Sequence, residues 1–242
     1  MAGGRSGGVL VAIEGIDGAG KTTQANLLLE RLQKANIDAL CTKEPTNGAH
    51  GQRIKQSATE GRLPVREELA LFIADRKEHV EEVLAPALAQ GKVVIVDRYY
   101  FSTAAYQGAR GVPADEIIAM NEAFAPEPNL LVLLEISVAT AMRRITDRAE
   151  DVGNHFERRS ALQKCAAIFG TIKRPYLLRI DGERGRADIH NDIVHALDEG
   201  PLFRSFCQTK YRTECEPEYC TPRIVGTCQY PQLDIRRLPQ SR

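Results

Sequence analysis

The sequence lacks an excess of charge of either sign, because 32 Lys and Arg face 32 Asp and Glu over 242 residues. That balance argues against a non-specific nucleic-acid binder, which needs a basic surface. No apolar run approaches the roughly 20 residues that span a bilayer, and residues 1–8 lack the apolar stretch of a secretory signal. We therefore expect a soluble, cytoplasmic protein that binds neither nucleic acid nor membrane.

The neutral total conceals two unequal parts. Residues 1–200 hold 25 basic and 28 acidic side chains, whereas residues 201–242 hold seven basic and four acidic ones. The second part also carries the cysteines Cys207, Cys215, Cys220 and Cys228. Only the middle pair has a spacing that suits structural zinc. Three interpretations of this part stay open: a zinc site, an extension packed on the body, and a partner-binding tail. We expect a flexible N-terminus (1–8), a body (9–198) and a C-terminal extension of unknown role (199–242).

Five short apolar runs predict buried strands, and helical spacing of apolar residues fills the stretches between them. The strands are predicted at 9–13, 38–42, 93–96, 130–136 and 176–180. Helices are predicted from about 22, at 51–59, 65–90 with a kink at Pro86, 102–108, 113–124, 138–148, 157–171 and 188–197. Strands that alternate with helices predict an α/β fold in three layers, with a five-stranded parallel sheet flanked by helices. Ligands of such sheets bind outside the carboxyl ends of the strands.

A phosphate-binding loop follows the first predicted strand. Residues 15–22 match G-x-x-x-x-G-K-[ST] at every fixed position, between a predicted strand and a predicted helix. Glycines let backbone N–H groups converge on phosphate oxygens, and the positive end of the helix adds to them. Lys21 can reach the β- and γ-phosphates of a nucleoside triphosphate, and the Thr22 hydroxyl can bind Mg²⁺. The residues expected to bind ATP are Gly15, Ile16, Asp17, Gly18, Ala19, Gly20, Lys21, Thr22 and Thr23.

Two further pairs of residues suit phosphoryl transfer to a second nucleotide. Asp97 and Arg98 follow a buried strand directly, which places a guanidinium at the ligand edge of the sheet, where it can fork onto a phosphate. Phe72 and Arg76 lie four residues apart and share one helix face, where a ring can stack on a base and Arg can donate to a base carbonyl. The alternatives are a structural Asp–Arg pair that closes the strand, and a core aromatic beside a solvated Arg.

Three blocks of sequence together resemble the thymidylate kinases. They are VAIEGIDGAGKTTQ at 11–24, LFIADR at 71–76 with VDRY at 96–99, and STAAYQG at 102–108. The similarity runs from about residue 9 to residue 197. It implies the three-layer P-loop kinase fold, transfer of the γ-phosphate of ATP to dTMP with Mg²⁺, and a homodimer.

The resemblance also implies roles for individual residues. Lys21, Arg98, Arg148 and Asp97 would be catalytic, Thr22 and Asp97 would hold Mg²⁺, and Tyr106 would lie under the sugar and disfavour a 2′-hydroxyl. The residues implied to bind the acceptor nucleotide are Asp17, Lys43, Lys55, Phe72, Arg76, Arg98, Ser102, Thr103, Tyr106, Gln107 and Glu157.

The match departs from the family pattern at two places. Lys43 and Lys55 stand where the family commonly has Arg, and Lys keeps the charge without the bidentate fork. The lid, at about 148–157, is short. With Gly18 in the phosphate loop, the family supplies its catalytic Arg from the lid. Arg148 is the first choice for that role, and the substitutes are Arg144, Arg158 and Arg159.

The function expected from the sequence is phosphorylation of dTMP to dTDP with ATP. The alternatives are a kinase of another deoxynucleoside monophosphate, which Lys43, Lys55 and the short lid suggest, and a nucleotide-binding switch or scaffold without turnover that acts through the C-terminal tail. The partners expected in each case include small-molecule nucleotides.

Overall fold

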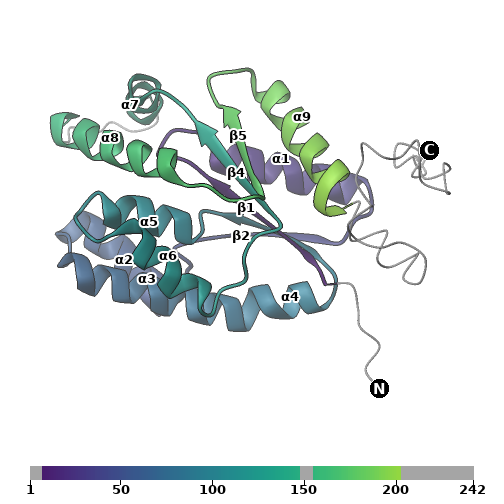
Figure 1. Cartoon of the computed structure of the whole chain (residues 1–242), viewed down its shortest axis with the longest axis horizontal. Coiled ribbons are helices and arrows are strands. Elements are labelled where there is room, and N and C mark those ends of the chain that lie inside the picture. Colours follow the sequence, from purple (N-terminus) through teal and green to yellow (C-terminus); the bar gives the residue numbers. More distant parts are fainter. Residues whose placement is uncertain (1–6, 148–154, 203–242) are drawn as a thin grey trace.

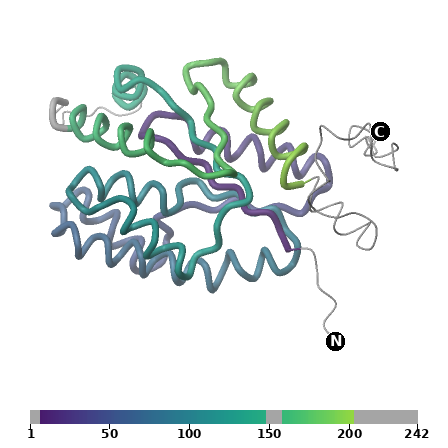
Figure 2. Tube along the Cα trace, viewed as in Figure 1, coloured from purple at the N-terminus to yellow at the C-terminus, as the bar shows by residue number. Residues whose placement is uncertain are grey.

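The computed structural model describes residues 7–147 and 155–202, and within these ranges five parallel strands form one sheet in the order β2-β3-β1-β4-β5. The strands are β1 (Val9–Glu14), β2 (Ala39–Lys43), β3 (Val93–Asp97), β4 (Leu130–Glu135) and β5 (Leu177–Asp181). Each lies within one residue of its predicted range at either end. Segments far apart in the sequence, such as β1 and β4, lie side by side (Figure 2). The sheet predicted from the sequence is confirmed.

Helices cover both faces of the sheet and give the three predicted layers (Figure 1). One face is covered by α1 (Lys21–Lys34) and α9 (Arg186–Leu197), and a π-helical turn η2 (Asp198–Leu202) continues α9. The other face is covered by α3 (Val65–His79), the π-helical turn η1 (Val80–Leu84), α4 (Ala85–Ala89), α5 (Tyr100–Gly108), α6 (Ala114–Glu122) and α8 (His155–Thr171). Two further helices, α2 (Ala49–Glu60) and α7 (Val138–Thr146), contact α3 and α8 respectively.

Alternation along the buried strands divides the core into two halves. On β1, Val11 and Ile13 face α1 and α9, whereas Leu10 and Ala12 face the larger group of helices. All are nearly inaccessible to water. A strand covered on both faces becomes apolar throughout, which is why it is a continuous hydrophobic run in the sequence.

The long helix predicted at 65–90 is interrupted, although not at Pro86 itself. The interruption is the turn η1, in which the Ala85 N–H bonds to the carbonyl of Val80, five residues earlier. Proline has no N–H and its ring excludes the carbonyl four residues before it, so a regular helix cannot run through Pro86. The wider turn ends at Leu84, two residues before Pro86, which then lies in the first turn of α4, where proline is tolerated.

The sheet order places three loops together at its carboxyl edge. Asp97 of β3 is in register with Ile13 of β1 on one side and with Lys43 of β2 on the other. The segments that follow β1, β2 and β3 therefore begin side by side. The predicted phosphate loop, the 44–48 segment and the Arg98 turn are those segments.

The predicted boundaries between the N-terminus, the body and the C-terminal extension stay predictions. The helical turn η2 crosses the predicted end of the body at residue 198, and the cysteines of the extension lie outside the described residues.

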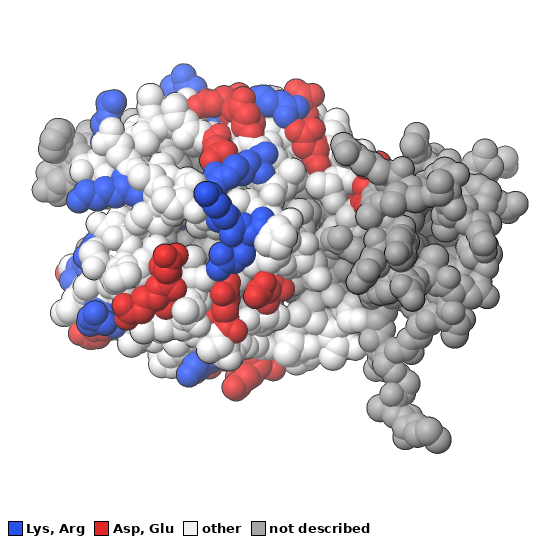
Figure 3. All heavy atoms as spheres, viewed as in Figure 1, with Lys and Arg blue, Asp and Glu red and all other residues white. Residues whose placement is uncertain are grey.

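Among the described residues, none of the helices has the length and apolar character needed to span a bilayer. On the face seen in Figure 3, Lys and Arg lie among Asp and Glu.

Candidate active site

The loop from Gly15 to Gly20 connects β1 to α1 and requires glycine at two tight places. Gly15 and Gly18 have φ angles of 140° and 81°, which L side chains rarely adopt. A Cβ on Gly15 would lie 2.5 Å from the Leu134 carbonyl oxygen, and one on Gly18 would lie 2.9 Å from that of Ala141. The loop is therefore packed closely against β4 and α7.

Lys21 lies inside this loop. Its Nζ donates to the carbonyl oxygens of Gly15 at 2.9 Å and Ile16 at 2.8 Å, and the residue is only 5% exposed. Burial, together with the nearby Arg98 guanidinium, lowers the pKa of Lys21 to about 7. A low pKa means that the surroundings stabilise the charged ammonium form poorly. The negative charge of a bound phosphate would stabilise it.

Thr22 and Asp97 meet where Mg²⁺ is predicted. The Thr22 hydroxyl donates to Asp97 Oδ2 at 2.5 Å, and Lys43 Nζ lies 3.6 Å from the same oxygen. The other oxygen, Asp97 Oδ1, is buried without a hydrogen-bond partner among the described residues. An unpartnered buried carboxylate oxygen beside a hydroxyl is a donor set that suits Mg²⁺ or a water bound to it. These residues fit the ion.

The Arg98 turn brings the predicted acceptor residues to the phosphate loop. Arg98 has a φ of 72°, and its guanidinium bonds to the Asp17 carboxylate and to Ser102 Oγ, the latter at 3.3 Å. It also lies 5.4 Å above the ring of Tyr106, whose hydroxyl accepts from the Asp17 N–H at 3.1 Å. Burial alone would raise the pKa of the Asp17 carboxyl, but Arg98 and Lys21 outweigh it and hold that pKa below its usual value.

Arg76, predicted to hold the base, is already extensively bonded. It is 1% exposed and donates to Glu44 Oε2 from Nε (2.8 Å) and NH2 (2.5 Å). It also donates to Asn121 Oδ1 at 2.6 Å and Thr103 Oγ1 at 3.0 Å. These bonds use four of the five N–H groups of the guanidinium, so one is left for a base. Phe72, one helical turn earlier, is partly exposed.

The remaining predicted acceptor residues divide between the site and its supports. Ser102 contacts Arg98, and Lys43 lies beside Asp97. Lys55 instead donates to the Thr46 carbonyl and Asn47 Oδ1, both at 2.7 Å. Gln107 is buried and donates to Glu68 Oε2 at 2.8 Å. In this arrangement Lys55 and Gln107 hold segments of the site together.

The predicted lid residues are only partly described. Arg148 and the side chain of Glu157 lie outside the described residues. Of the substitutes, Arg144 donates to the carbonyls of Gly18 and Gly182, both at 3.2 Å, so it contacts the phosphate loop directly. Arg158 and Arg159 lie near the start of α8.

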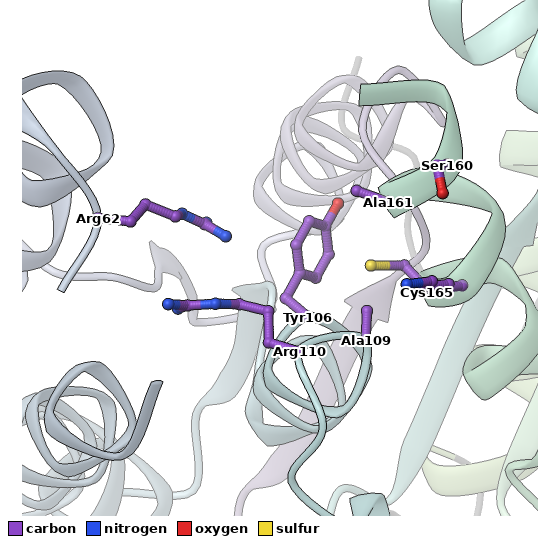
Figure 4. Close-up of a pocket in the computed structure, with 8 residues that line it drawn as sticks. Arg62, Tyr106, Ala109, Arg110, Ser160, Ala161 and Cys165 are labelled. Carbon is purple, nitrogen blue, oxygen red and sulfur yellow. The ribbon is translucent and has the colours of Figure 1, made fainter. Parts of the chain in front are cut away.

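A cavity of about 240 Å³ opens beside Tyr106 (Figure 4). It is lined by Arg62, Tyr106, Ala109, Arg110, Ser160, Ala161, Lys164 and Cys165. Arg62 and Arg110 lie on one side of the Tyr106 ring, and Ser160 and Cys165 lie on the other (Figure 4). Of these residues, only Tyr106 is a site residue predicted from the sequence, because the cavity depends on how α5 packs against α8.

Sequence reasoning also missed the partners of Arg76. Glu44 accepts from Arg76, and its other oxygen lies 2.9 Å from His79 Nδ1, all within the core. Two signals could have indicated them. Glu44 lies two residues after a predicted strand, at the ligand edge of the sheet, and His79 lies three residues after Arg76, on the same helix face.

Comparison with known proteins assigns the family. The family model for thymidylate kinase matches residues 13–193. A thymidylate kinase of Xanthomonas campestris pv. campestris is 50% identical over 195 residues, which cover 79% of this chain and 85% of that protein. One from Xanthomonas oryzae pv. oryzae is 50% identical over 197 residues, covering 80% and 86%. One from Akkermansia muciniphila is 43% identical over 190 residues, covering 78% and 91%. The chain belongs to the thymidylate kinase family.

Proposed function

We propose that the chain transfers the γ-phosphate of ATP to dTMP and forms ADP and dTDP. The observation that carries this proposal is the Arg98 guanidinium, which bonds to Asp17 of the phosphate loop while it lies over the Tyr106 ring. A cation at the end of β3 thus meets the loop that binds the donor. Phosphoryl transfer asks a protein mainly to hold two phosphate groups in line and to neutralise their charge, and this arrangement suits both tasks.

On the donor side, Lys21 exchanges its two carbonyl partners for phosphate oxygens of ATP. Thr22 and Asp97 are the residues that would hold Mg²⁺, through the hydroxyl and the carboxylate. Bound there, the ion supplies positive charge to the phosphates. The described residues contain no cluster of three or more His, Cys, Asp or Glu that could hold a metal.

On the acceptor side, Arg98 binds the phosphate of dTMP with two N–H groups. Tyr106 lies under the sugar, and its hydroxyl is held by the Asp17 N–H. Phe72 stacks on the base, and Arg76 donates its remaining N–H to a base carbonyl. Because Glu44 and Asn121 fix the plane of the Arg76 guanidinium, that N–H points in one direction, which favours one pattern of base carbonyls.

The lid supplies the cation for the transferred phosphoryl group. Arg148 stays the first choice. Arg144 has structural support of its own, because it already contacts the Gly18 carbonyl. The homodimer and the cytoplasmic location expected from the sequence also stay predictions.

A coupled assay of ADP production tests the proposal. ATP and Mg²⁺ are supplied with dTMP, dUMP, dCMP, dAMP or dGMP in turn, and Lys21→Ala serves as the inactive control. We expect rapid turnover with dTMP and little with the others. Turnover that prefers another acceptor would identify a different nucleotide kinase. Tight nucleotide binding without turnover on any of the five would exclude both enzyme functions and favour a switch or scaffold.

A further inference from the structure

Glu14, the last residue of β1, is a buried carboxylate for which the sequence predicts no role. It is 0% exposed in an otherwise apolar strand. Its Oε1 accepts from the backbone N–H groups of Tyr99 at 2.8 Å and Ser102 at 2.9 Å. Its Oε2 accepts from the Ser102 hydroxyl at 2.5 Å. All three donors belong to the segment that follows β3, across the site from the phosphate loop.

These bonds cap the helix α5. Tyr99 is the residue before its first turn and Ser102 is the third helical residue, and no side chain of the segment itself caps the helix. Free N–H groups at a helix start usually bond to a capping side chain from the same segment. Here a carboxylate from another strand does so, and the positive end of the helix favours it. Burial raises the pKa of Glu14, while these donors and Arg98 act to lower it.

The same bonds hold the turn that presents Arg98. Its φ of 72° is a conformation that a residue with a side chain keeps only where the surroundings impose it. On one side, the Arg98 N–H bonds to the Ile13 carbonyl at 3.1 Å, and on the other, Glu14 holds Tyr99. The Ser102 hydroxyl that donates to Glu14 also accepts from the Arg98 guanidinium at 3.3 Å. The end of β1 thus holds both the backbone and the side chain of Arg98.

We propose that Glu14 is a positioning residue of the acceptor site. It fixes the Arg98 turn and the start of α5, the helix that carries Thr103 and Tyr106, and it does so through the reach of its two oxygens. The kinetic part of this inference rests on the proposed function. It predicts that the acceptor side depends on Glu14 far more than the donor side does, although Glu14 directly precedes the phosphate loop.

Three substitutions separate reach from charge. Glu14→Gln keeps the reach and the acceptor for the two N–H groups, and its amide can donate to the Ser102 hydroxyl. Glu14→Asp keeps the charge but withdraws the oxygens by about one bond length. Glu14→Ala removes both. Because a misplacement of about 1 Å can cost roughly 100-fold in rate, we expect kcat/KM for dTMP to fall about 100-fold in Glu14→Ala, about 30-fold in Glu14→Asp and under about 5-fold in Glu14→Gln. KM for ATP should stay within about twofold in each.

The control is Ile193→Ala, which removes a fully buried side chain on α9, on the opposite face of the sheet. It should lower the melting temperature and leave the KM for dTMP unchanged. A Glu14→Gln variant worse than Glu14→Asp would overturn the proposal, because charge and not position would then matter. Equal losses toward ATP and dTMP would overturn it too. If Glu14→Ala does not fold, the Asp and Gln variants decide.

Hydrogen exchange of the Tyr99 and Ser102 amides gives a readout that needs no substrate. We expect both amides to be protected in the unaltered chain and in Glu14→Gln, and to exchange at least tenfold faster in Glu14→Asp. Unchanged exchange in Glu14→Asp would contradict the proposed link. If the unaltered chain does not phosphorylate dTMP, the proposed function fails, and the exchange experiment still tests the hold of Glu14 on this turn.

Discussion

Replacing Arg98 with Lys tests the acceptor site with a minimal change. Lys keeps the positive charge beside Asp17 and the ring of Tyr106, and it meets the same backbone demand at a φ of 72°. It loses the planar fork, so it donates one bond to a phosphate where Arg donates two. A hydrogen bond to a charged group contributes about 1.5–3 kcal/mol. At 1.36 kcal/mol per tenfold change, kcat/KM for dTMP should fall by about 10- to 150-fold.

Steady-state kinetics with each substrate varied in turn measures this loss. KM for ATP should change by less than about twofold, because Lys21 keeps its carbonyl partners in the phosphate loop. The matched control is Arg179→Lys, the same chemical change at an Arg that pairs with Glu135 at the other side of the sheet. It should leave dTMP kinetics unaltered. A kcat/KM for dTMP that stays within threefold in Arg98→Lys, or a loss that falls on ATP, would show that the fork of Arg98 does not bind the acceptor phosphate.

Three further predictions concern the metal, the packing and a thiol. Asp97→Asn should raise the Mg²⁺ concentration for half-maximal activity by about 10- to 100-fold, because altering the groups around a metal typically weakens its binding by that factor. Glu135→Gln is the control, and an unchanged Mg²⁺ titration in Asp97→Asn would count against the site. Gly51→Ala should destabilise the fold by about 1–3 kcal/mol, since the new Cβ would lie 2.3 Å from the Thr46 carbonyl oxygen. Its melting temperature should fall by about 2–12 °C, whereas Gly170→Ala, whose new Cβ would meet no described atom within 4 Å, should not lower it. Cys165 should resist iodoacetamide at pH 8, because burial raises the pKa of its thiol to about 12 and only about one thiol in ten thousand is then ionised. Peptide mass mapping checks this, and labelling as fast as in the denatured chain would contradict it.

The features that could be predicted from the sequence are those that local pattern determines. A strand buried on both faces is an apolar run, so β3 and β4 were located within a residue. Gly15 and Lys21 belong to a motif whose spacing follows from the geometry of one loop. Arg98 was identified because it directly follows a buried strand, and the ends of parallel strands share one edge.

The features that could not be predicted depend on pairing between distant segments. Glu14 caps a helix whose first residue lies 86 positions later in the chain, which no periodicity reveals. Arg76 was placed at the base, but its bonds to Glu44 and Asn121 require three segments to pack. Gln107 was assigned to the substrate, and its bond to Glu68 joins α5 to α3. Such side chains look like ordinary polar residues until tertiary structure gives them a partner.

In the proposed reaction, the γ-phosphate of ATP ends on dTMP. Phosphorus NMR of a reaction containing ATP, Mg²⁺, dTMP and the full chain follows the donor, the acceptor and both products at once. We expect ADP and dTDP to appear in equal amounts, with no accumulation of inorganic phosphate. Inorganic phosphate formed together with ADP, while the dTMP signal stays constant, would contradict it.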